Sequence, residues 1–389
     1  MTKYILIFIL SFGIVHAGQY EEALKTISSN NKELKAYKEY LNSINLERRS
    51  GLLPSDPELE YSFLSGSGEI EGNKQEFIAS QMFEFPTVYS IKSDIADLQG
   101  SVSDYQLEAY KLEIIRSAQK HLNDYIYLKK QIAELNKRQE SSMKMLNTVQ
   151  SQYDNGDVGI LELNKAKSAL SISKSNYNLA LIELNSIESE ITNLNGGSPL
   201  NLENIDYPKV AAGNDFDSLI ARLKSANYSI KSIEEERKLL QSKLSLSKSG
   251  WFPKFGVGYR YENEPGIEYN GVQLQMSIPI FQNNNKVPKA ESELTTLELK
   301  NESYESRYFI GKKILFDKVI ELRRLYSEQK ELVDFSQLDL NRQAYESGQI
   351  SLTQYYIDNS IYYDIIDKML EVEMELNKAN AELMLELSF

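Results

Sequence analysis

The sequence predicts a mainly α-helical fold with a small β part, built from long antiparallel coiled-coil helices and two β-hairpins. Along several long segments, apolar residues recur at alternating steps of three and four, which is the spacing of a coiled-coil seam. Two short pairs of segments alternate apolar and polar residues with a period of two, which indicates strands. The same order of elements occurs twice along the chain, so we expect a duplication.

We expect the first repeat over residues 18–197. Apolar seams predict helices over 18–49, over about 88–154 and over 158–194. The segment 88–154 has no proline and a single glycine, so as a continuous helix it would be about 100 Å long. Alternating residues after the first helix predict a β-hairpin over about 57–86.

The second repeat is expected over residues 215–389, after a breaker-rich linker over 198–214. Its clearest feature is a hairpin over about 253–281, in which aromatic and aliphatic residues alternate with small or polar ones. A long helix is predicted over about 287–346, followed by a shorter one.

Three pairs of landmarks support the duplication. Their members are separated by similar distances along the chain: 196 residues for Pro57 and Pro253, 193 for Pro86 and Pro279, and 192 for Gly156 and Gly348. Pro86 and Pro279 follow the second strand of each hairpin, and proline both ends a strand ladder and starts a helix well. We therefore predict that these two prolines mark the strand-to-helix turns.

A Tyr-x-x-Gly motif follows each long helical segment. The two motifs are Tyr153 to Gly156 and Tyr345 to Gly348. Glycine adopts the left-handed conformation that ends a helix and lets the chain reverse. Each motif therefore predicts the tip of a helical hairpin.

Composition argues against an enzyme. The chain has 389 residues, a net charge of −13, no cysteine, and two histidines, His16 and His121. Thiolate sites and disulfides are excluded, and so few imidazoles disfavour a histidine-based metal site or catalytic triad. The acidic balance disfavours nucleic acid. An enzyme with paired carboxylates remains an alternative, but nothing singles out a pair among 56 acidic residues. We expect no enzyme activity and no cofactor.

Residues 1–17 predict a secretory signal peptide. Lys3 precedes an apolar run over 4–15, and Val15-His16-Ala17 offers small residues of the kind a signal peptidase reads. The alternative is a short membrane anchor, but the run is shorter than the roughly 20 residues that span a bilayer. No later segment reads as a membrane helix, so any membrane crossing would use strands.

Taken together, the pattern resembles the outer-membrane efflux proteins of the TolC type. The resemblance covers essentially all of the chain after the leader. It depends on the duplicated hairpin-plus-helices plan, on Tyr153-x-x-Gly156 followed by Leu161-Glu-Leu163, on the segment from Gly271 to Phe281, and on Leu194-Asn-Gly196. It implies a trimeric channel-tunnel, with a strand barrel in the outer membrane and a helical barrel in the periplasm. The implied partners are a periplasmic adaptor, an inner-membrane pump or ABC exporter, and outer-membrane lipid.

Strand counting agrees with a trimer. The four strands predicted for one chain are too few to close a barrel, and a barrel of about eight strands is filled by its own side chains. Twelve strands from three chains are the first assembly with room for a water-filled lumen. The alternative is a secreted periplasmic coiled-coil scaffold without a channel, in which the hairpins only cap helices.

The resemblance also implies site residues. The hairpin tips at Tyr153, Gly156, Tyr345 and Gly348 are the expected adaptor-docking surface. An acidic residue six positions after the tip glycine is common at the periplasmic gate of the family. The first repeat has Glu162 there, but the second has Gln354, so a ring of carboxylates is expected only from Glu162. The competing interpretation is that Glu162 is a solvated flank of a coiled coil.

Overall fold

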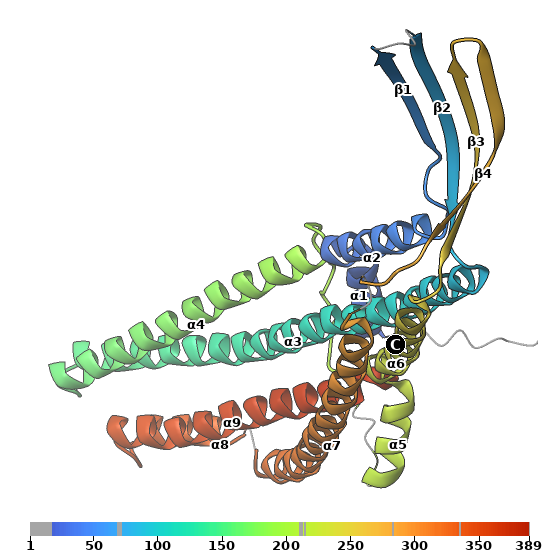
Figure 1. Cartoon of the computed structure of the whole chain (residues 1–389). Helices are drawn as coiled ribbons and strands as arrows, with labels where there is room; N and C mark the ends of the chain where they lie inside the picture. Colours follow the sequence, from blue (N-terminus) through green and yellow to red (C-terminus); the bar gives the residue numbers. More distant parts are fainter. Residues whose placement is uncertain are drawn as a thin grey trace, which may run out of the picture. The chain divides into compact units, whose positions relative to one another are not determined.

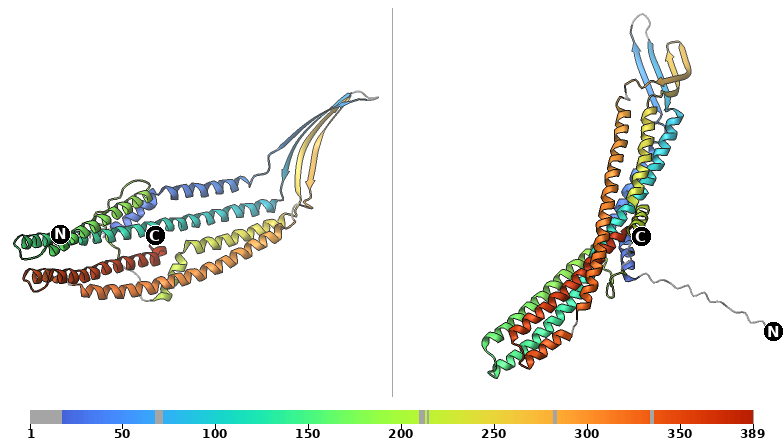
Figure 2. Two further views of the ribbon diagram at one scale, coloured as in Figure 1. Left: turned by 90° about the vertical axis from the view of Figure 1, so that its left-hand side faces the viewer. Right: turned by 90° about the horizontal axis from the view of Figure 1, so that it is seen from below.

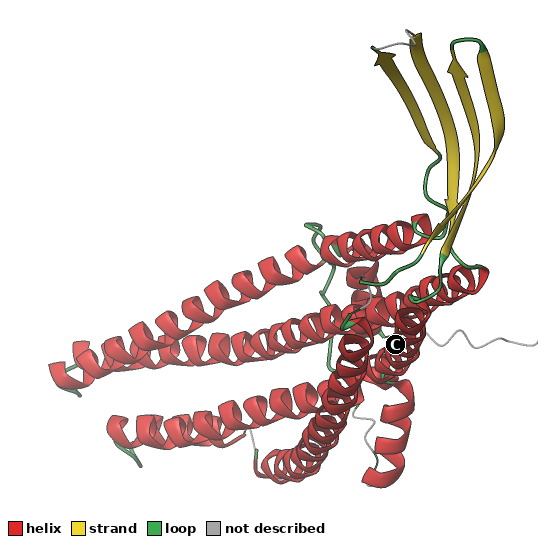
Figure 3. Ribbon diagram, in the orientation of Figure 1, coloured by secondary structure: helices red, strands yellow, loops and turns green. Residues whose placement is uncertain are grey.

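A computed structural model describes residues 18–67, 72–209, 213, 215–281, 284–333 and 336–388. The expected signal peptide lies outside the described residues, as do residues 210–212 and 214 of the expected linker. The described chain is mostly helical with one small sheet (Figure 3).

The elements follow one another in the order helices, hairpin, helices, twice over (Figure 1). Their bounds are α1 Gln19–Asn30, α2 Lys32–Ser50, β1 Glu58–Gly66, β2 Gly72–Phe83, α3 Pro86–Asp154, α4 Ile160–Leu194, α5 Phe216–Ala226, α6 Tyr228–Ser249, β3 Lys254–Glu264, β4 Ile267–Ser277, α7 Lys286–Leu332, α8 Ser336–Glu346, α9 Leu352–Met384 and a short 3₁₀ turn Leu385–Leu387.

The prediction of one helix over about 287–346 is wrong. The structure has two helices there, α7 and α8, and Val333 between them is not helical. A β-branched residue is a poor helix former, and serine, which begins α8 at Ser336, is favoured where helices start. The apolar seam continues through this point, which is why it predicted a single helix.

The prediction of one helix over 18–49 is also wrong, because Asn31 separates α1 from α2. The Asn31 side chain is buried, and its Nδ2 donates to the Leu194 carbonyl oxygen at the end of α4 at 2.9 Å. In the second half, Asn227 separates α5 from α6 and is likewise buried. Its Oδ1 accepts from the Ile230 backbone N–H at 2.9 Å, as a helix N-cap does. The two asparagines lie 196 residues apart, at the same spacing as Pro57 and Pro253.

The four strands form one antiparallel sheet in the order β1-β2-β3-β4. The register pairs Tyr61 with Phe77, Phe77 with Tyr261, and Tyr259 with Val272, so apolar side chains fall on the same face in every strand. Among the described residues, β1 and β4 each pair with a single strand.

The chain divides into two compact units, each with its own packing. One contains residues 33–111 and 220–311, and therefore the sheet with the parts of the helices that adjoin it. The other contains residues 1–32, 112–219 and 312–389, and therefore both Tyr-x-x-Gly motifs.

In the second of these units, the core lies along α3 and α9. Its fully buried side chains include Ile115, Leu122, Leu383 and Leu385. A buried ion pair lies in the same unit: Lys312 Nζ and Glu386 Oε2 are 2.7 Å apart, and both side chains are only 6% exposed. Lys312 therefore fixes the C-terminal end of α9 from within the core.

Candidate docking site at two helical hairpins

The first hairpin, α3 and α4, turns at Gly156. This glycine has a φ of +83°, in the left-handed region. Its N–H donates to the Tyr153 carbonyl at 3.0 Å, and the Asp157 N–H donates to the Gln152 carbonyl at 2.8 Å. This pair of hydrogen bonds is a Schellman motif, which satisfies the last carbonyls of α3 and reverses the chain.

The second hairpin, α8 and α9, has the same turn. Gly348 has a φ of +74°. Its N–H donates to the Tyr345 carbonyl at 2.9 Å, and the Gln349 N–H donates to the Ala344 carbonyl at 2.8 Å. Ser351 then caps α9, because its side chain accepts from the Gln354 N–H. Both Tyr-x-x-Gly motifs therefore lie at helical turns of one geometry. Figure 2 shows the α3–α4 turn (green) and the α8–α9 turn (red) at the same end of these helices.

The two tyrosines of the motifs have different environments. Tyr153 is 38% exposed, whereas Tyr345 is only 7% exposed. The Tyr345 hydroxyl donates to Gln152 Oε1 in the first hairpin at 2.6 Å. Burial raises the pKa of Tyr345, and the nearby negative charge of Glu162 raises it further. Tyr345 therefore joins the two hairpins, and only Tyr153 presents its ring to solvent.

An apolar core surrounds Tyr345 and includes residues of both hairpins. The rings of Tyr345 and Tyr355 have centroids 6.0 Å apart. The buried members of this core are Met145, Val149, Leu163, Ala166, Tyr345, Leu352 and Tyr355. Because they come from α3, α4, α8 and α9, the two tips form one packed body rather than two separate hairpins.

The gate candidates lie at the starts of α4 and α9. Glu162 is in the first turn of α4 and is half-buried. Gln354 is exposed, and its Nε2 donates to Asp358 Oδ1 at 2.7 Å. No hydrogen bond between Glu162 and Gln354 is seen in the described part of the chain. Instead, α4 and α9 are joined by Lys165, whose Nζ donates to Thr353 Oγ1 at 2.9 Å.

The two predicted turn prolines differ in position. Pro86 is the first residue of α3, three positions after the strand ends at Phe83. Pro279 lies in the connection between β4 and α7, seven residues before the helix begins at Lys286. Pro86 therefore starts a helix, whereas Pro279 only follows the end of a strand.

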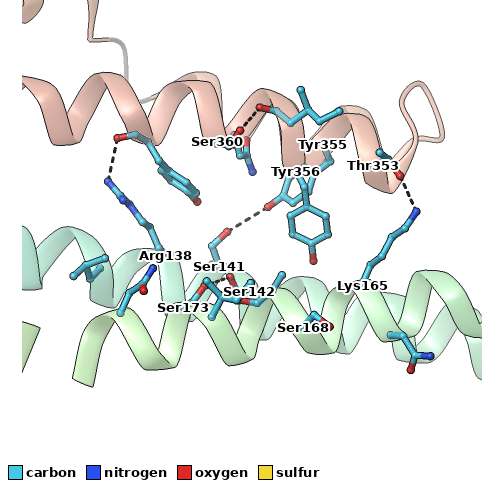
Figure 4. A pocket seen from close by; sticks show the side chains of 18 of the residues that line it. Arg138, Ser141, Ser142, Lys165, Ser168, Ser173, Thr353, Tyr355, Tyr356 and Ser360 are labelled. Atoms are coloured by element: carbon cyan, nitrogen blue, oxygen red, sulfur yellow. Dashed lines mark hydrogen bonds between the residues drawn. The ribbon is translucent and has the colours of Figure 1, made fainter. Parts of the chain in front are cut away.

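A pocket between α3, α4 and α9 was missed from the sequence (Figure 4). Its volume is about 820 Å³. No carboxylate lines it, and its only charged residues are Arg138 and Lys165. The rest of the lining consists of hydroxyl, amide, aromatic and aliphatic side chains, among them Ser141, Ser142, Asn164, Ser168, Ile172, Ser173, Thr353, Tyr356 and Ile357.

Arg138, which lines this pocket, links α3 to α9. Its guanidinium donates to both carboxylate oxygens of Asp367 on α9, at 2.8 and 2.6 Å. It also lies over the Tyr363 ring, 4.4 Å from the centroid. A bidentate pair of this kind fixes geometry as well as adding energy. The sequence offered one signal for it, an arginine in the long helix whose partner could not be identified before α3 and α9 were known to be adjacent.

Among the described residues, no group of three or more His, Asp or Glu side chains is placed to hold a metal ion. In the same part of the chain, none of the helices combines the length and the apolar character of a membrane span.

Comparison with known proteins identifies the fold. No family model and no curated protein sequence matches the chain. Solved structures do match, and each of the three named here aligns with 95% of this chain. The outer membrane protein VceC from Vibrio cholerae has a TM-score of 0.75 and 9% identity, with 96% of that chain covered. The Campylobacter jejuni CmeC outer membrane channel has a TM-score of 0.71 and 14% identity, with 85% of that chain covered. The Neisseria gonorrhoeae MtrE outer membrane channel in its open state has a TM-score of 0.68 and 14% identity, with 88% of that chain covered. The chain therefore has the fold of outer-membrane efflux channels of the TolC type.

Proposed function

We propose that this chain is the outer-membrane channel component of a tripartite efflux or type I secretion system, a passive export duct from the periplasm to the exterior. The observation that carries the proposal is the sheet, which exposes one apolar face and has two incompletely paired edge strands in a fold shared with outer-membrane channels. We expect it to lie in the outer membrane with its helices in the periplasm.

The two faces of the sheet support contact with lipid on one side and water on the other. Large apolar side chains are exposed on one face; they include Leu59, Tyr61, Phe63, Val257, Tyr259, Val272, Leu274 and Met276. The opposite face carries charges, with Lys74 Nζ 2.9 Å from Glu264 and Arg260 2.7 Å from Glu76. Alternation of this kind is what a strand between lipid and a wet lumen requires.

The edges of the sheet support a homotrimer. A sheet in lipid has no water to satisfy the backbone groups of its edge strands, so it must close. If β4 of each copy pairs with β1 of the next, three copies close a barrel of twelve strands. The expected assembly is therefore a ring in which each contact joins different faces of neighbouring chains.

The hairpin tips are the proposed docking surface for a periplasmic adaptor, which would connect the channel to an inner-membrane pump or ABC exporter. Tyr153 and Gly156 support this role because they are exposed at the turn. Gly348 is exposed in the same way, whereas the buried ring of Tyr345 supports a role in holding the tips together. Glu162, one helical turn from the first tip, remains the proposed acidic residue of the gate.

The channel proposal is tested by conductance. Purified protein should form a trimer in detergent and give discrete conductance steps in planar lipid bilayers. A periplasmic scaffold, the competing function, would remain soluble without detergent and give no steps. A soluble, non-conducting protein would therefore refute the channel and favour the scaffold.

Docking is tested at the first tip. Tyr153→Ala should abolish export in cells while trimer assembly and bilayer conductance stay unchanged. Tyr40→Ala, at another exposed tyrosine on α2, is the matched control and should affect neither. Gly156→Val and Gly348→Val should block the left-handed turns at a cost of about 1 kcal/mol or more each. Normal export by assembled Tyr153→Ala and Gly156→Val proteins would exclude the tips as the docking surface.

A further inference from the structure

Two segments outside the strands expose large apolar side chains beside the hairpin β3–β4. Trp251 and Phe252 precede β3 and are 54% and 46% exposed. Ile278, Ile280 and Phe281 follow β4 and are 61% to 82% exposed. Because Lys254 at the start of β3 pairs with Ser277 at the end of β4, both segments leave the same end of the hairpin. We refer to these five side chains as the junction cluster.

The junction cluster continues the apolar face of the sheet. Phe255 and Met276 are paired in the register, adjoin the cluster in sequence, and are 44% and 60% exposed. Large apolar side chains exposed together at one end of a hairpin are unfavourable in water and indicate a contact with a partner or a membrane. The face it extends is the one proposed to contact lipid, so the cluster would meet the bilayer where the strands end and the helices begin. Tryptophan is suited to that boundary, because its ring is apolar and its indole N–H is polar.

A basic pocket lies at the same end of the hairpin. It has a volume of about 290 Å³ and is shared by residues from both segments, Phe252 and Pro279, and from the adjoining helices. Three lysines line it, Lys92, Lys254 and Lys286, against a single carboxylate. That carboxylate, Glu84, has an oxygen 2.5 Å from Lys92 Nζ and another 3.4 Å from Lys254 Nζ.

Like the pocket between α3, α4 and α9, the basic pocket has an excess of positive charge. The chain has a net charge of −13, yet the lining of the pocket carries two more positive than negative side chains. Lysines beside an apolar surface extend their ammonium groups toward lipid phosphates while their methylene stems lie on the apolar side chains. Anionic lipids attract such lysines by about 1 kcal/mol each, which is about fivefold in affinity.

We propose that the junction cluster and the basic pocket together bind an anionic phospholipid of the leaflet nearest the helices. Its phosphate would contact the lysines, and its acyl chains would lie along Ile280, Phe281 and the apolar face of the sheet. A soluble phosphate would use only the pocket and leave the apolar side chains exposed, so the cluster assigns the ligand to the bilayer. The inference rests on the proposed channel function.

The chain offers a built-in probe, because Trp251 in the junction cluster is its only tryptophan. The full-length protein is inserted into vesicles of equal parts phosphatidylcholine and phosphatidylglycerol, in which one lipid at a time carries brominated acyl chains. Bromine quenches tryptophan fluorescence on contact. Brominated phosphatidylglycerol should quench Trp251 more strongly than brominated phosphatidylcholine at the same content.

Charge variants test the pocket. Lys254→Gln and Lys286→Gln should each lower the relative affinity for phosphatidylglycerol by about fivefold, so that in the double variant both brominated lipids quench equally. Lys254→Arg and Lys286→Arg keep the charge and should keep the preference. The matched control is Lys167→Gln with Lys174→Gln, two exposed lysines on α4, which should change nothing.

Two outcomes would overturn the inference. Equal quenching of the wild type by both brominated lipids would exclude a site for anionic lipid. Quenching by aqueous iodide, with none from either lipid, would place Trp251 in water and exclude the junction cluster from the bilayer. Conductance of the same vesicles separates these results from failure of the channel proposal: conducting vesicles with either outcome refute the lipid site alone, whereas absent conductance refutes the channel.

Discussion

The buried ion pair between Lys312 and Glu386 gives a stability prediction whose size follows from the structure. Among the described residues, Lys312 Nζ donates to Glu386 Oε2 at 2.7 Å, to the Glu382 carbonyl at 2.9 Å and to the Leu383 carbonyl at 3.2 Å. Lys312→Met keeps the volume of the side chain but removes the charge. The carboxylate of Glu386 is then buried without its cation, which costs about 3–5 kcal/mol.

Removing both charges should cost much less. In Lys312→Met with Glu386→Leu, both charges of the pair are removed, and apolar replacement of a buried pair is often neutral or stabilising. The double variant still loses the two hydrogen bonds to the carbonyls of α9, about 1 kcal/mol each. We therefore expect a net loss of at most about 2 kcal/mol, smaller than that of the single variant.

Hydrogen exchange at the C-terminal end of α9 measures this difference without unfolding the whole assembly. A loss of about 3–5 kcal/mol corresponds to protection factors lower by about two to four orders of magnitude. The amides of residues 382–388 should show this drop in Lys312→Met and recover most of it in the double variant. If the double variant exchanges as fast as the single variant, the pair contributes through packing alone and the electrostatic reasoning is refuted.

Three further predictions concern the tips and the pocket. Tyr345→Phe removes the hydrogen bond to Gln152 and should reduce the protection of the amides at both hairpin tips from hydrogen exchange by about 1 kcal/mol. Unchanged hydrogen exchange would show that apolar packing alone holds the two tips together. Arg138→Gln breaks the bidentate link to Asp367, a partly exposed pair of about 1 kcal/mol after solvent screening, and should lower the protection of the neighbouring amides of α3 and α9 from hydrogen exchange by about that amount, whereas unchanged exchange would show that packing alone joins the two helices. Glu162→Gln should lower the cation preference of trimers in planar bilayers, and an unchanged preference would remove Glu162 from the gate.

The periodic elements were predictable from sequence because each depends on local pattern. The two hairpins, the long helix that ends at Asp154 and both glycine turns follow from alternation, heptad spacing and the special conformations of glycine. The breaks between α1 and α2 and between α7 and α8 could not be predicted from these local patterns. Asn31 interrupts a continuous apolar seam because its side chain bonds to the end of α4, a contact with a residue 163 positions away. A break that depends on a distant partner leaves no signal in the local pattern.

The candidate site was predictable only in part, for a related reason. The sequence places Tyr153 and Tyr345 in equivalent motifs, and the resemblance implies that both belong to the docking surface. The structure buries Tyr345 because Gln152, from the other half of the chain, accepts its hydroxyl. Arg138 was missed in the same way, because its role depends on Asp367, 229 residues further along. Repeats with the same motif thus differ through contacts that only the assembled fold reveals.

The unequal tyrosines also bear on stoichiometry. The proposed trimer would have six hairpin tips, three of one kind and three of another, alternating around the ring. A partner that requires an exposed aromatic side chain at the turn would have three sites in that trimer, at Tyr153. A partner with six equal arms must instead recognise what the tips share, which is the backbone of the two glycine turns. Counting adaptor chains per trimer would therefore show whether side chain or backbone is recognised.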